Sequence, residues 1–532
     1  MNFKFKHLSA ALVAVCSGLV LTSCFSSRGN QGTSSVTGWA YNDPTNMGGF
    51  ENYSGYEQEV GPGLVRVEGG TFIMGRVEQD VMYSWDAQPR RVSVSSFFMD
   101  ECEVSNSNYR EWLWWLSKVF SRQEYPQVLR NALPDTLVWR RSLAYNEPYV
   151  ENYLRHPAYS DYPVVGVSHR QATNFCKWRT DRVNENILFE RGVLNKVETL
   201  KKQMSDEGGG GQHNFNTEAY LYGALGDDVI VMDEENNPYE SVKMPMGEDD
   251  EGEVTKRHIR IEDGVLLPKY RLPTEAEWEF AALGIVGNTS EERVSERKIF
   301  PWNSHVLRNP DEADRGRMMA NYVRSNGDYM GTAGDLNDAG DITVPVRSYW
   351  PNDYGLYCMA GNVNEWVADV YRAQSMDDFD EFNPFRGNVF RQKLLDDEGK
   401  LVEVDSVGNV RYEVQRQSQI ADRKNYRTAD NRNFGDGDKW SNQVEGNGDW
   451  TASEMTTADM YDGSKADNNL RSLVTDSTRV YKGGGWRDRA YWLSPGTRRF
   501  LHEDDSRDDL GFRCAMTKLG SPYNQYGKKK KR

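Results

Sequence analysis

The sequence predicts a loop-rich α+β fold that is interrupted by two long insertions. Early segments such as 91–98 alternate apolar and polar side chains, as half-buried strands do. Later segments place apolar side chains at helical spacing, but strands and helices never alternate regularly enough for a doubly wound sheet. Two long polar stretches, 185–266 and 372–478, lack periodic patterns and separate these segments.

The first elements are predicted to be strands. Residues 63–67 form an apolar run that leads into a Glu-Gly-Gly turn at 68–70, and residues 71–75 continue the strand. Residues 91–98 alternate with period two and are predicted to pair with it.

Helices are predicted next. Residues 106–120 carry Tyr109, Leu113, Leu116 and Phe120 at helical spacing. Capping boxes precede two further helical patterns: Ser168 with Gln171, and Thr274 with Glu277, the second helix ending at Gly284. Glu275, Glu277 and Glu279 are interpreted as charges at a helix start rather than as a catalytic pair.

The composition limits the classes of function. The chain has 532 residues, 38% of them hydrophobic, so a large core can form. Length alone suggests about three domains, but the ordered motifs below favour one enlarged domain. The net charge of −16 makes nucleic acid an unsuitable partner. The four arginines at 487, 489, 498 and 499 could form a basic face, but pairing with core carboxylates is the preferred explanation.

The N-terminus carries a targeting pattern. Lys4 and Lys6 precede an apolar run that ends in Leu21-Thr22-Ser23-Cys24, which resembles a bacterial lipoprotein box. We expect residues 1–23 to be a signal peptide, Cys24 to be lipidated and residues 24–60 to be a tether. The absence of Asp after Cys24 favours the outer membrane. An ordinary secretory peptide with an incidental cysteine is the alternative.

The C-terminus and the cysteines leave alternatives open. Residues 521–532 end in Lys528–Arg532, which could contact anionic headgroups or an acidic partner, or could be a solvated tail. Four cysteines remain beyond the lipoprotein box, namely Cys102, Cys176, Cys358 and Cys514. An exported chain could form disulfides, and four thiols allow three full pairings.

Six segments occur in a fixed order: 67–75, 98–106, 162–168, 271–279, 352–366, and 482–486 with the closing 511–514. Together they resemble the formylglycine-generating-enzyme, or sulfatase-modifying-factor, family. The resemblance spans roughly residues 62–518 and implies a fold related to that of C-type lectins. It places one domain at 61–520, with insertions at 185–266 and 372–478.

The resemblance also identifies a departure from the active enzymes. These bind copper(I) with two cysteines shortly after the Gly-Gly pair at 483–484, because this soft ion prefers sulfur. By ungapped alignment the two cysteines fall on Asp488 and Leu493, and the adjacent family serine falls on Gly485. No cysteine lies between Cys358 and Cys514 to replace them. We therefore expect a pseudoenzyme that binds no copper.

Two structural features of the family carry over in part. Cys176 and Cys514 match family positions that form a disulfide, although two buried free thiols are the alternative. Calcium could bind through oxygen ligands in two sets. The first set is Asn321, the Tyr322 carbonyl, Asp338 and the Gly340 carbonyl; the second is the carbonyls of Gly361 and Val363 with Glu365. The remaining ligand position of the second set falls on Cys358, which weakens it.

Within the family, the chain is similar to gliding-motility lipoproteins. The segments that suggest this are 37–39, 75–82, 152–159, 178–184 and 482–492. The resemblance implies a lipid-anchored, periplasm-facing scaffold of the type IX secretion and gliding machinery, whose partners include related lipoproteins. A module that binds peptidoglycan or another glycan is the alternative, and an active oxidase ranks third.

Overall fold

The structure is a computed structural model that describes part of the chain. The described residues are 33–41, 50–52, 56–76, 80–81, 83–84, 86–204, 214–225, 229–242, 254–286, 298–302, 305–324, 340–372, 381–382, 384–387, 391–397, 401–402, 404–414 and 477–520. The expected signal peptide with Cys24 and the basic tail lie outside them. The chain divides into two compact units, which are described separately. The larger unit takes in 58–189, 195–231 and 266 onward, and the smaller one takes in residues up to 57, 190–194 and 232–265.

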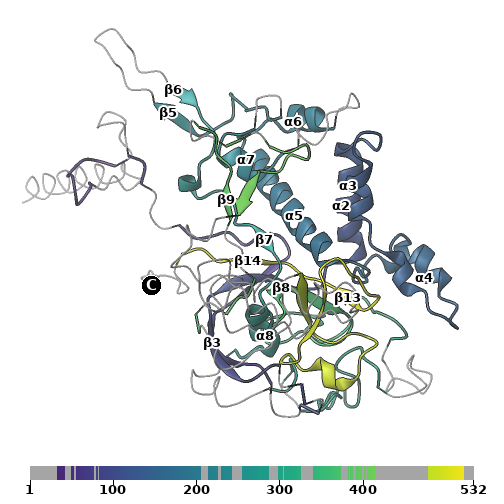
Figure 1. The fold of residues 1–532 in the computed structure, drawn as a ribbon. Coiled ribbons are helices and arrows are strands. Elements are labelled where there is room, and N and C mark those ends of the chain that lie inside the picture. The colour runs from purple at the N-terminus through teal and green to yellow at the C-terminus, as the bar shows by residue number, and fades with distance from the viewer. Residues whose placement is uncertain are drawn as a thin grey trace, which may run out of the picture. The chain divides into compact units, whose positions relative to one another are not determined.

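Two four-stranded sheets form the centre of the larger unit (Figure 1). The first has the order β1 (Leu64–Val67), β4 (Phe97–Asp100), β14 (Ala515–Thr517), β7 (Tyr270–Arg271), with antiparallel neighbours. The second has the order β12 (Arg499–His502), β11 (Thr478–Lys482), β8 (Asn364–Val370), β13 (Leu510–Gly511), and β13 runs parallel to β8. Two hairpins add β2 (Gly70–Met74) with β3 (Arg90–Val94), and β9 (Arg391–Lys393) with β10 (Tyr412–Val414).

The larger unit also contains helices. They are α2 (Asn106–Val119), α3 (Pro126–Ala132), α4 (Glu147–Asn152), α5 (His169–Glu190), α6 (Lys196–Gln203), α7 (Thr217–Leu221) and α8 (Glu275–Leu283). Short 3-10 turns are η1 (Thr136–Trp139), η2 (Pro157–Tyr159) and η8 (Ala490–Leu493). Within the described ranges, no helix combines the length and the apolar character that crossing a bilayer requires.

The structure confirms the strands predicted at 63–67 and 71–75 as β1 and β2. The strand predicted at 91–98 is two strands, β3 and β4. Residues 91–98 were expected to be one strand, but β3 ends at Val94 and β4 begins at Phe97. The Ser96 hydroxyl accepts a hydrogen bond from the Gly69 amide at 2.9 Å, which fixes the bend between the two strands. The two halves then pair with different partners, β3 with β2 and β4 with β1.

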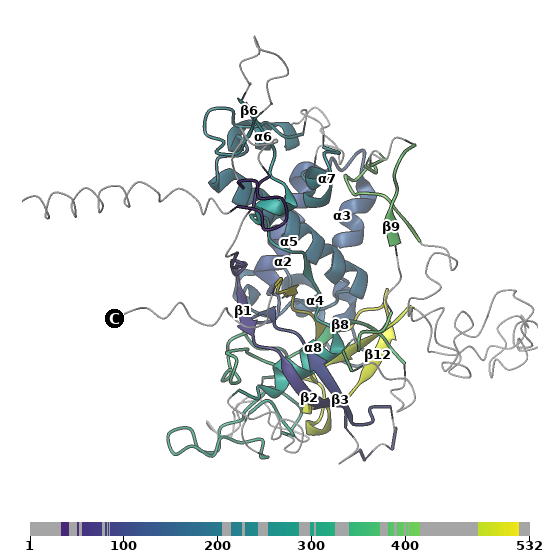
Figure 2. The same cartoon turned by 90° about the vertical axis from the view of Figure 1, so that its left-hand side faces the viewer.

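The predicted helix ends are confirmed. Ser105 caps α2 by accepting from the Asn108 amide. Thr274 and Glu277 form a complete capping box, and Gly284 ends α8 in the left-handed conformation at φ 54°. Figure 2 shows α8 behind the β2–β3 hairpin, where Phe280 meets Phe72 edge to face.

Aromatic side chains fill the core between α2 and α5. Tyr109 of α2 stacks on Phe175 of α5 with ring centroids 5.8 Å apart. Phe512 packs edge to face against both rings. Burial of such large rings is a main source of stability, since each removes about 150–250 Å² from water.

The interval 185–266 was expected to lack regular structure, and this is wrong. α5 continues to Glu190, and α6 and α7 follow. Asn195 caps α6 and Asn216 caps α7, each with a side-chain oxygen that accepts from amides of the first turn. These local caps were overlooked because the apolar periodicity around them is weak.

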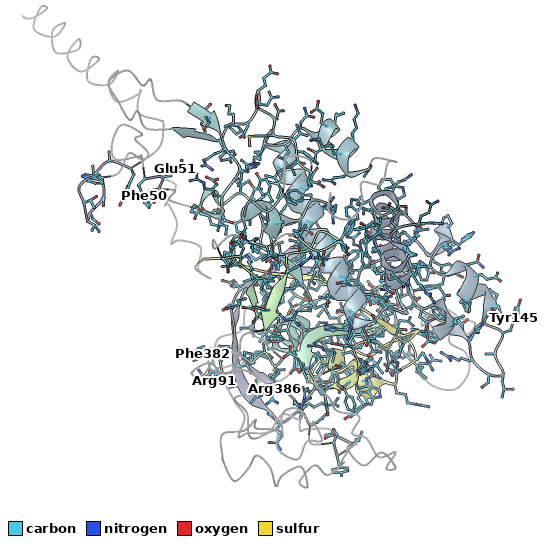
Figure 3. The ribbon with its side chains drawn as sticks, turned by 45° about the horizontal axis from the view of Figure 1, so that its top comes forward. Phe50, Glu51, Arg91, Tyr145, Phe382 and Arg386 are labelled. Atoms are coloured by element: carbon cyan, nitrogen blue, oxygen red, sulfur yellow. The ribbon has the colours of Figure 1, made fainter. Side chains whose placement is uncertain are left out.

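The second interval, 372–478, is described only in part, and one part of it lies against β3. The Ser93 amide donates to the Glu381 carbonyl at 2.9 Å, and Arg91 pairs with the Glu381 carboxylate at 2.9 Å. Figure 3 shows Arg91, Phe382 and Arg386 in this part of the unit. The same view shows Tyr145 pointing into solvent beside α4.

The smaller unit contains a short hairpin of β5 (Glu240–Val242) and β6 (Val254–Lys256), followed by the 3-10 turn η4 (Ile261–Asp263). Arg257 donates to both carboxylate oxygens of Asp263, at 2.6 and 2.7 Å, and to Glu51 at 2.9 Å. This buried guanidinium ties three segments of the unit together.

Candidate functional site

The glycine turn after β11 comes just before the two positions at which the family resemblance places copper-binding cysteines. Gly483 and Gly484 have φ values of 103° and 70°, which side chains with a Cβ rarely adopt. A Cβ on Gly484 would lie 2.8 Å from the Trp492 carbonyl oxygen. The turn therefore requires glycine, and it brings residues 485–488 against the start of β8.

Asp488, at the first aligned cysteine position, is the centre of a buried hydrogen-bond network. Its carboxylate accepts from the Gly485 amide at 2.8 Å and from the Asn364 side chain at 3.0 Å. Arg499 of β12 donates both terminal nitrogens to it, at 2.8 and 2.6 Å. Burial acts to raise the pKa of Asp488, but the hydrogen bonds and charge of Arg499 outweigh it and hold the pKa below its usual range. Asp488 is therefore ionised and fully partnered.

A second carboxylate extends this network toward β13. Asp509 accepts two hydrogen bonds from Arg507, at 2.8 and 2.9 Å, and contacts the Asn364 side chain. Burial raises the pKa of Asp509, and the Arg507 charge opposes that rise. Two carboxylates thus face two guanidinium groups. We call Asn364, Asp488, Arg499, Arg507 and Asp509 the acid–arginine cluster.

Leu493, at the second aligned cysteine position, is fully buried in an apolar cluster. Its buried neighbours there are Phe300, Met318, Ala320, Tyr322 and Ala360. No donor atom can come from this side chain. The serine position is also closed, because a Cβ on Gly485 would lie 3.0–3.1 Å from Asn364 and Asp509. The residues at these positions do not fit a copper ion.

The second predicted calcium set does not fit calcium in this arrangement. Glu365 is fully buried, and its two oxygens accept from Arg513 at 2.6 Å each. Trp278 donates a third hydrogen bond at 2.8 Å. A cation there would have to compete with a buried guanidinium, and Cys358 offers a thiol where calcium needs oxygen. Gly361 and Val363 precede Glu365 in the chain, and the Val363 amide donates a hydrogen bond to Glu103 at 3.3 Å.

The first predicted calcium set is brought together in part. The Asn321 side chain accepts from the Gly340 amide at 2.9 Å and donates to the Ile342 carbonyl at 2.8 Å. The Tyr322 side chain is buried near Leu493. Asp338 lies outside the described residues, so calcium at this set stays a prediction. Among the residues whose placement is described, no three His, Cys, Asp or Glu side chains converge as metal ligands would.

Cys176 of α5 and Cys514 meet in the core of the larger unit. Their sulfur atoms lie 3.3 Å apart as buried thiols, whereas a disulfide bond is about 2.05 Å long. The bond itself stays a prediction.

A further buried ion network was missed by the sequence analysis. Lys482, fully buried on β11, pairs with Glu279 at 2.7 Å and Glu275 at 3.2 Å. Arg498 donates to both oxygens of Glu275. Glu275 and Glu277 lie in the first turn of α8, as predicted. Glu279 does not, and Glu275 and Glu279 are partners in this buried ion network. The pairing predicted for the arginines at 498 and 499 is confirmed.

A small hollow lies near the Leu493 cluster. Its lining is rich in aromatic and proline side chains: Pro301, Trp302, Tyr349, Trp350 and Pro351. Trp302 stacks on Phe300 and donates its indole hydrogen to the Val306 carbonyl at 2.8 Å. Trp350 is 38% exposed, so a flat ligand could reach it.

The fold and this turn define an α+β protein in which Asp488 and Leu493 stand at the two aligned positions after the turn. The chain matches the sulfatase-modifying factor enzyme 1-like domain over residues 50–518, and it belongs to that family. It is 22% identical to mouse formylglycine-generating enzyme over 60% of this chain and 61% of the relative. It is 35% identical to the Thermomonospora curvata enzyme over 22% of this chain and 33% of the relative.

A third relative is the cattle protein named inactive C-alpha-formylglycine-generating enzyme 2. It is 35% identical over 20% of this chain and 29% of the relative. The chain thus spans from about a third to three fifths of the curated relatives' lengths. Among solved structures, PvdO from Pseudomonas aeruginosa aligns with a TM-score of 0.36 and 15% identity over 85% of this chain and 94% of that one.

Proposed function

We propose that this protein is a non-catalytic structural member of its family. The observation that carries the proposal is the acid–arginine cluster, in which Asp488 occupies the first copper position as a fully partnered carboxylate. Leu493 closes the second position with hydrocarbon. A copper oxidase that lacks both sulfurs has lost its electron relay, and neighbouring groups cannot restore it. The existence of relatives named as inactive is consistent with this proposal.

The test is a direct assay on the purified full-length chain. We expect no stoichiometric binding of copper(I) and no oxygen-dependent turnover of a cysteine-containing peptide. An active family member serves as the positive control, and its variant without the two cysteines serves as the matched negative control. Stoichiometric copper together with turnover would refute the proposal.

We further propose the setting in which this scaffold acts. The N-terminal Leu21-Thr22-Ser23-Cys24 pattern supports a lipid anchor at Cys24 in the outer membrane, with the folded part facing the periplasm. The similarity to the gliding-motility lipoprotein GldJ, and to its relatives GldK and PorK, supports a place in the type IX secretion and gliding machinery. Crosslinking in intact cells, followed by identification of the attached proteins, tests this. Recovery of cell-wall fragments alone would contradict it.

A glycan-binding module is the second candidate. The partly exposed Trp350 favours it, because sugar rings stack on exposed aromatic faces. Sedimentation with purified sacculi distinguishes the two candidates. A binder loses sedimentation when Trp350→Ala is introduced, whereas a scaffold that does not bind sacculi stays in the supernatant in both forms.

A further inference from the structure

We propose that Cys102 and Cys358 form a disulfide that ties the end of β4 to the loop before β8. Neither the sequence pattern nor the family resemblance assigns a partner to these two cysteines. They are the pair that remains when the adjacent thiols of Cys176 and Cys514 are set aside.

The backbone places the two cysteines in neighbouring segments. The Tyr357 amide donates to the Glu101 carbonyl at 2.8 Å, so the residues just before the two cysteines are directly hydrogen-bonded. Arg513 clamps the same two segments, because it donates to the Asp100 carbonyl at 3.2 Å and to the Tyr357 carbonyl at 2.8 Å. Both segments are therefore held in register.

The segment of Val346 and Arg347 contacts both cysteine segments. The Cys358 sulfur lies 3.5 Å from the Val346 carbonyl oxygen, and Arg347 pairs with Glu101, the residue before Cys102, at 2.6 Å. The bond requires the two sulfur atoms to approach to about 2.05 Å.

The conformation of Cys358 supports a constraint at this point. Its φ of 51° is in the left-handed region, where a residue with a Cβ is strained unless its surroundings hold it. A covalent bond to the β4 end would supply that hold. Cys358 stands at the remaining ligand position of the second predicted calcium set, which does not fit calcium in this chain.

The chemistry is thiol–disulfide exchange with a small disulfide such as oxidised glutathione. Cys102 is partly exposed and reacts first: its thiolate attacks one glutathione sulfur, forms a mixed disulfide and releases one glutathione thiolate. The buried Cys358 thiolate then attacks the Cys102 sulfur and expels the second glutathione. Two electrons pass to the glutathione disulfide, and the two thiol protons pass to the released glutathione or solvent.

Peptide mapping of the full-length chain tests the proposal. Trypsin places the four cysteines in separate peptides: 92–110 with Cys102, 348–372 with Cys358, 171–177 with Cys176, and 514–518 with Cys514. The folded protein is equilibrated with oxidised glutathione and then alkylated under denaturing conditions without reduction. Burial raises the pKa of Cys102 to about 11, so mildly alkaline pH is used to speed the exchange.

We expect a linked 92–110/348–372 peptide that disappears on reduction. Cys102→Ser should make peptide 348–372 fully alkylatable, and Cys358→Ser should do the same for peptide 92–110. Cys176→Ser is the matched control and should leave the 92–110/348–372 link intact. Alkylation of both cysteines in the equilibrated wild type, or a link from Cys102 to a second copy or to Cys176, would overturn the proposal. Because the wild-type result decides, misfolding of a variant does not affect the test.

Discussion

Removal of the Asp488 carboxylate tests whether the acid–arginine cluster stabilises the fold. Asp488→Ala deletes four hydrogen bonds and leaves the Arg499 guanidinium, whose side chain is 16% exposed, without its carboxylate. Removing one partner of a buried pair costs about 3–5 kcal/mol. Arg499 keeps its contacts with the faces of Tyr481 and Trp492, at 4.9 and 4.4 Å, so we expect the low end, about 3 kcal/mol.

The assay is urea unfolding of the purified chain, followed by tryptophan fluorescence. The control is Glu147→Ala, which removes an equally well-formed but exposed partner of Arg140 and should cause no measurable change. Replacing both Asp488 and Arg499 with leucine should destabilise the protein less than Asp488→Ala, since no buried charge is then left unpaired. If the urea midpoint of Asp488→Ala equals that of the wild type, the acid–arginine cluster does not stabilise the fold.

Three further substitutions have definite expected outcomes. His169 is buried against Trp366, and burial lowers its pKa from 6.5 to about 3. The unfolded chain therefore takes up a proton at a higher pH than the folded chain does. The free energy of unfolding should fall by about 1.4 kcal/mol per pH unit as the pH drops from 6.5 toward 3. Urea unfolding at several pH values should show a shallower fall for His169→Gln. Gly485→Ser should cost about 1–3 kcal/mol in the same assay, because its Cβ would crowd Asn364, and an unchanged midpoint would contradict the close packing. Arg513→Lys keeps the charge, but a lysine cannot donate to both carboxylate oxygens of Glu365 in the same paired geometry. We therefore expect a lower unfolding free energy and less soluble protein. Wild-type values for both would refute the bidentate geometry.

Features that depend on a few neighbouring residues could be predicted from the sequence. The Thr274–Glu277 capping box and the Gly284 exit specify the ends of α8 within ten residues of chain, and both were predicted. The bend between β3 and β4 was not, because the alternating pattern continues through it. A hydrogen bond from Gly69 to Ser96, distant in sequence, fixes that bend.

In the candidate site, too, local features could be predicted from the sequence and long-range contacts could not. That no cysteine stands at 488 or 493 is visible from the sequence alone, since it needs only an alignment. The contacts of the residues that stand there are not visible in the sequence. Asp488 meets Asn364 across 124 positions, and Asn364 meets Asp509 across 145. Glu275 and Glu279 look like helix-start charges, and only the fold brings the buried Lys482 to them.

The residues at the two aligned positions fill the buried turn after β11. Unfilled space in a buried position is costly, because the surrounding atoms lose contacts. Here one position is hydrocarbon that packs with Phe300 and Ala360, and the other is a carboxylate that bridges β8, the turn and β12. Arg507 and Asp509 continue the bridge to β13. Asp488 and its neighbours therefore join the strands of the second sheet, and replacing Asp488 with cysteine would break that connection.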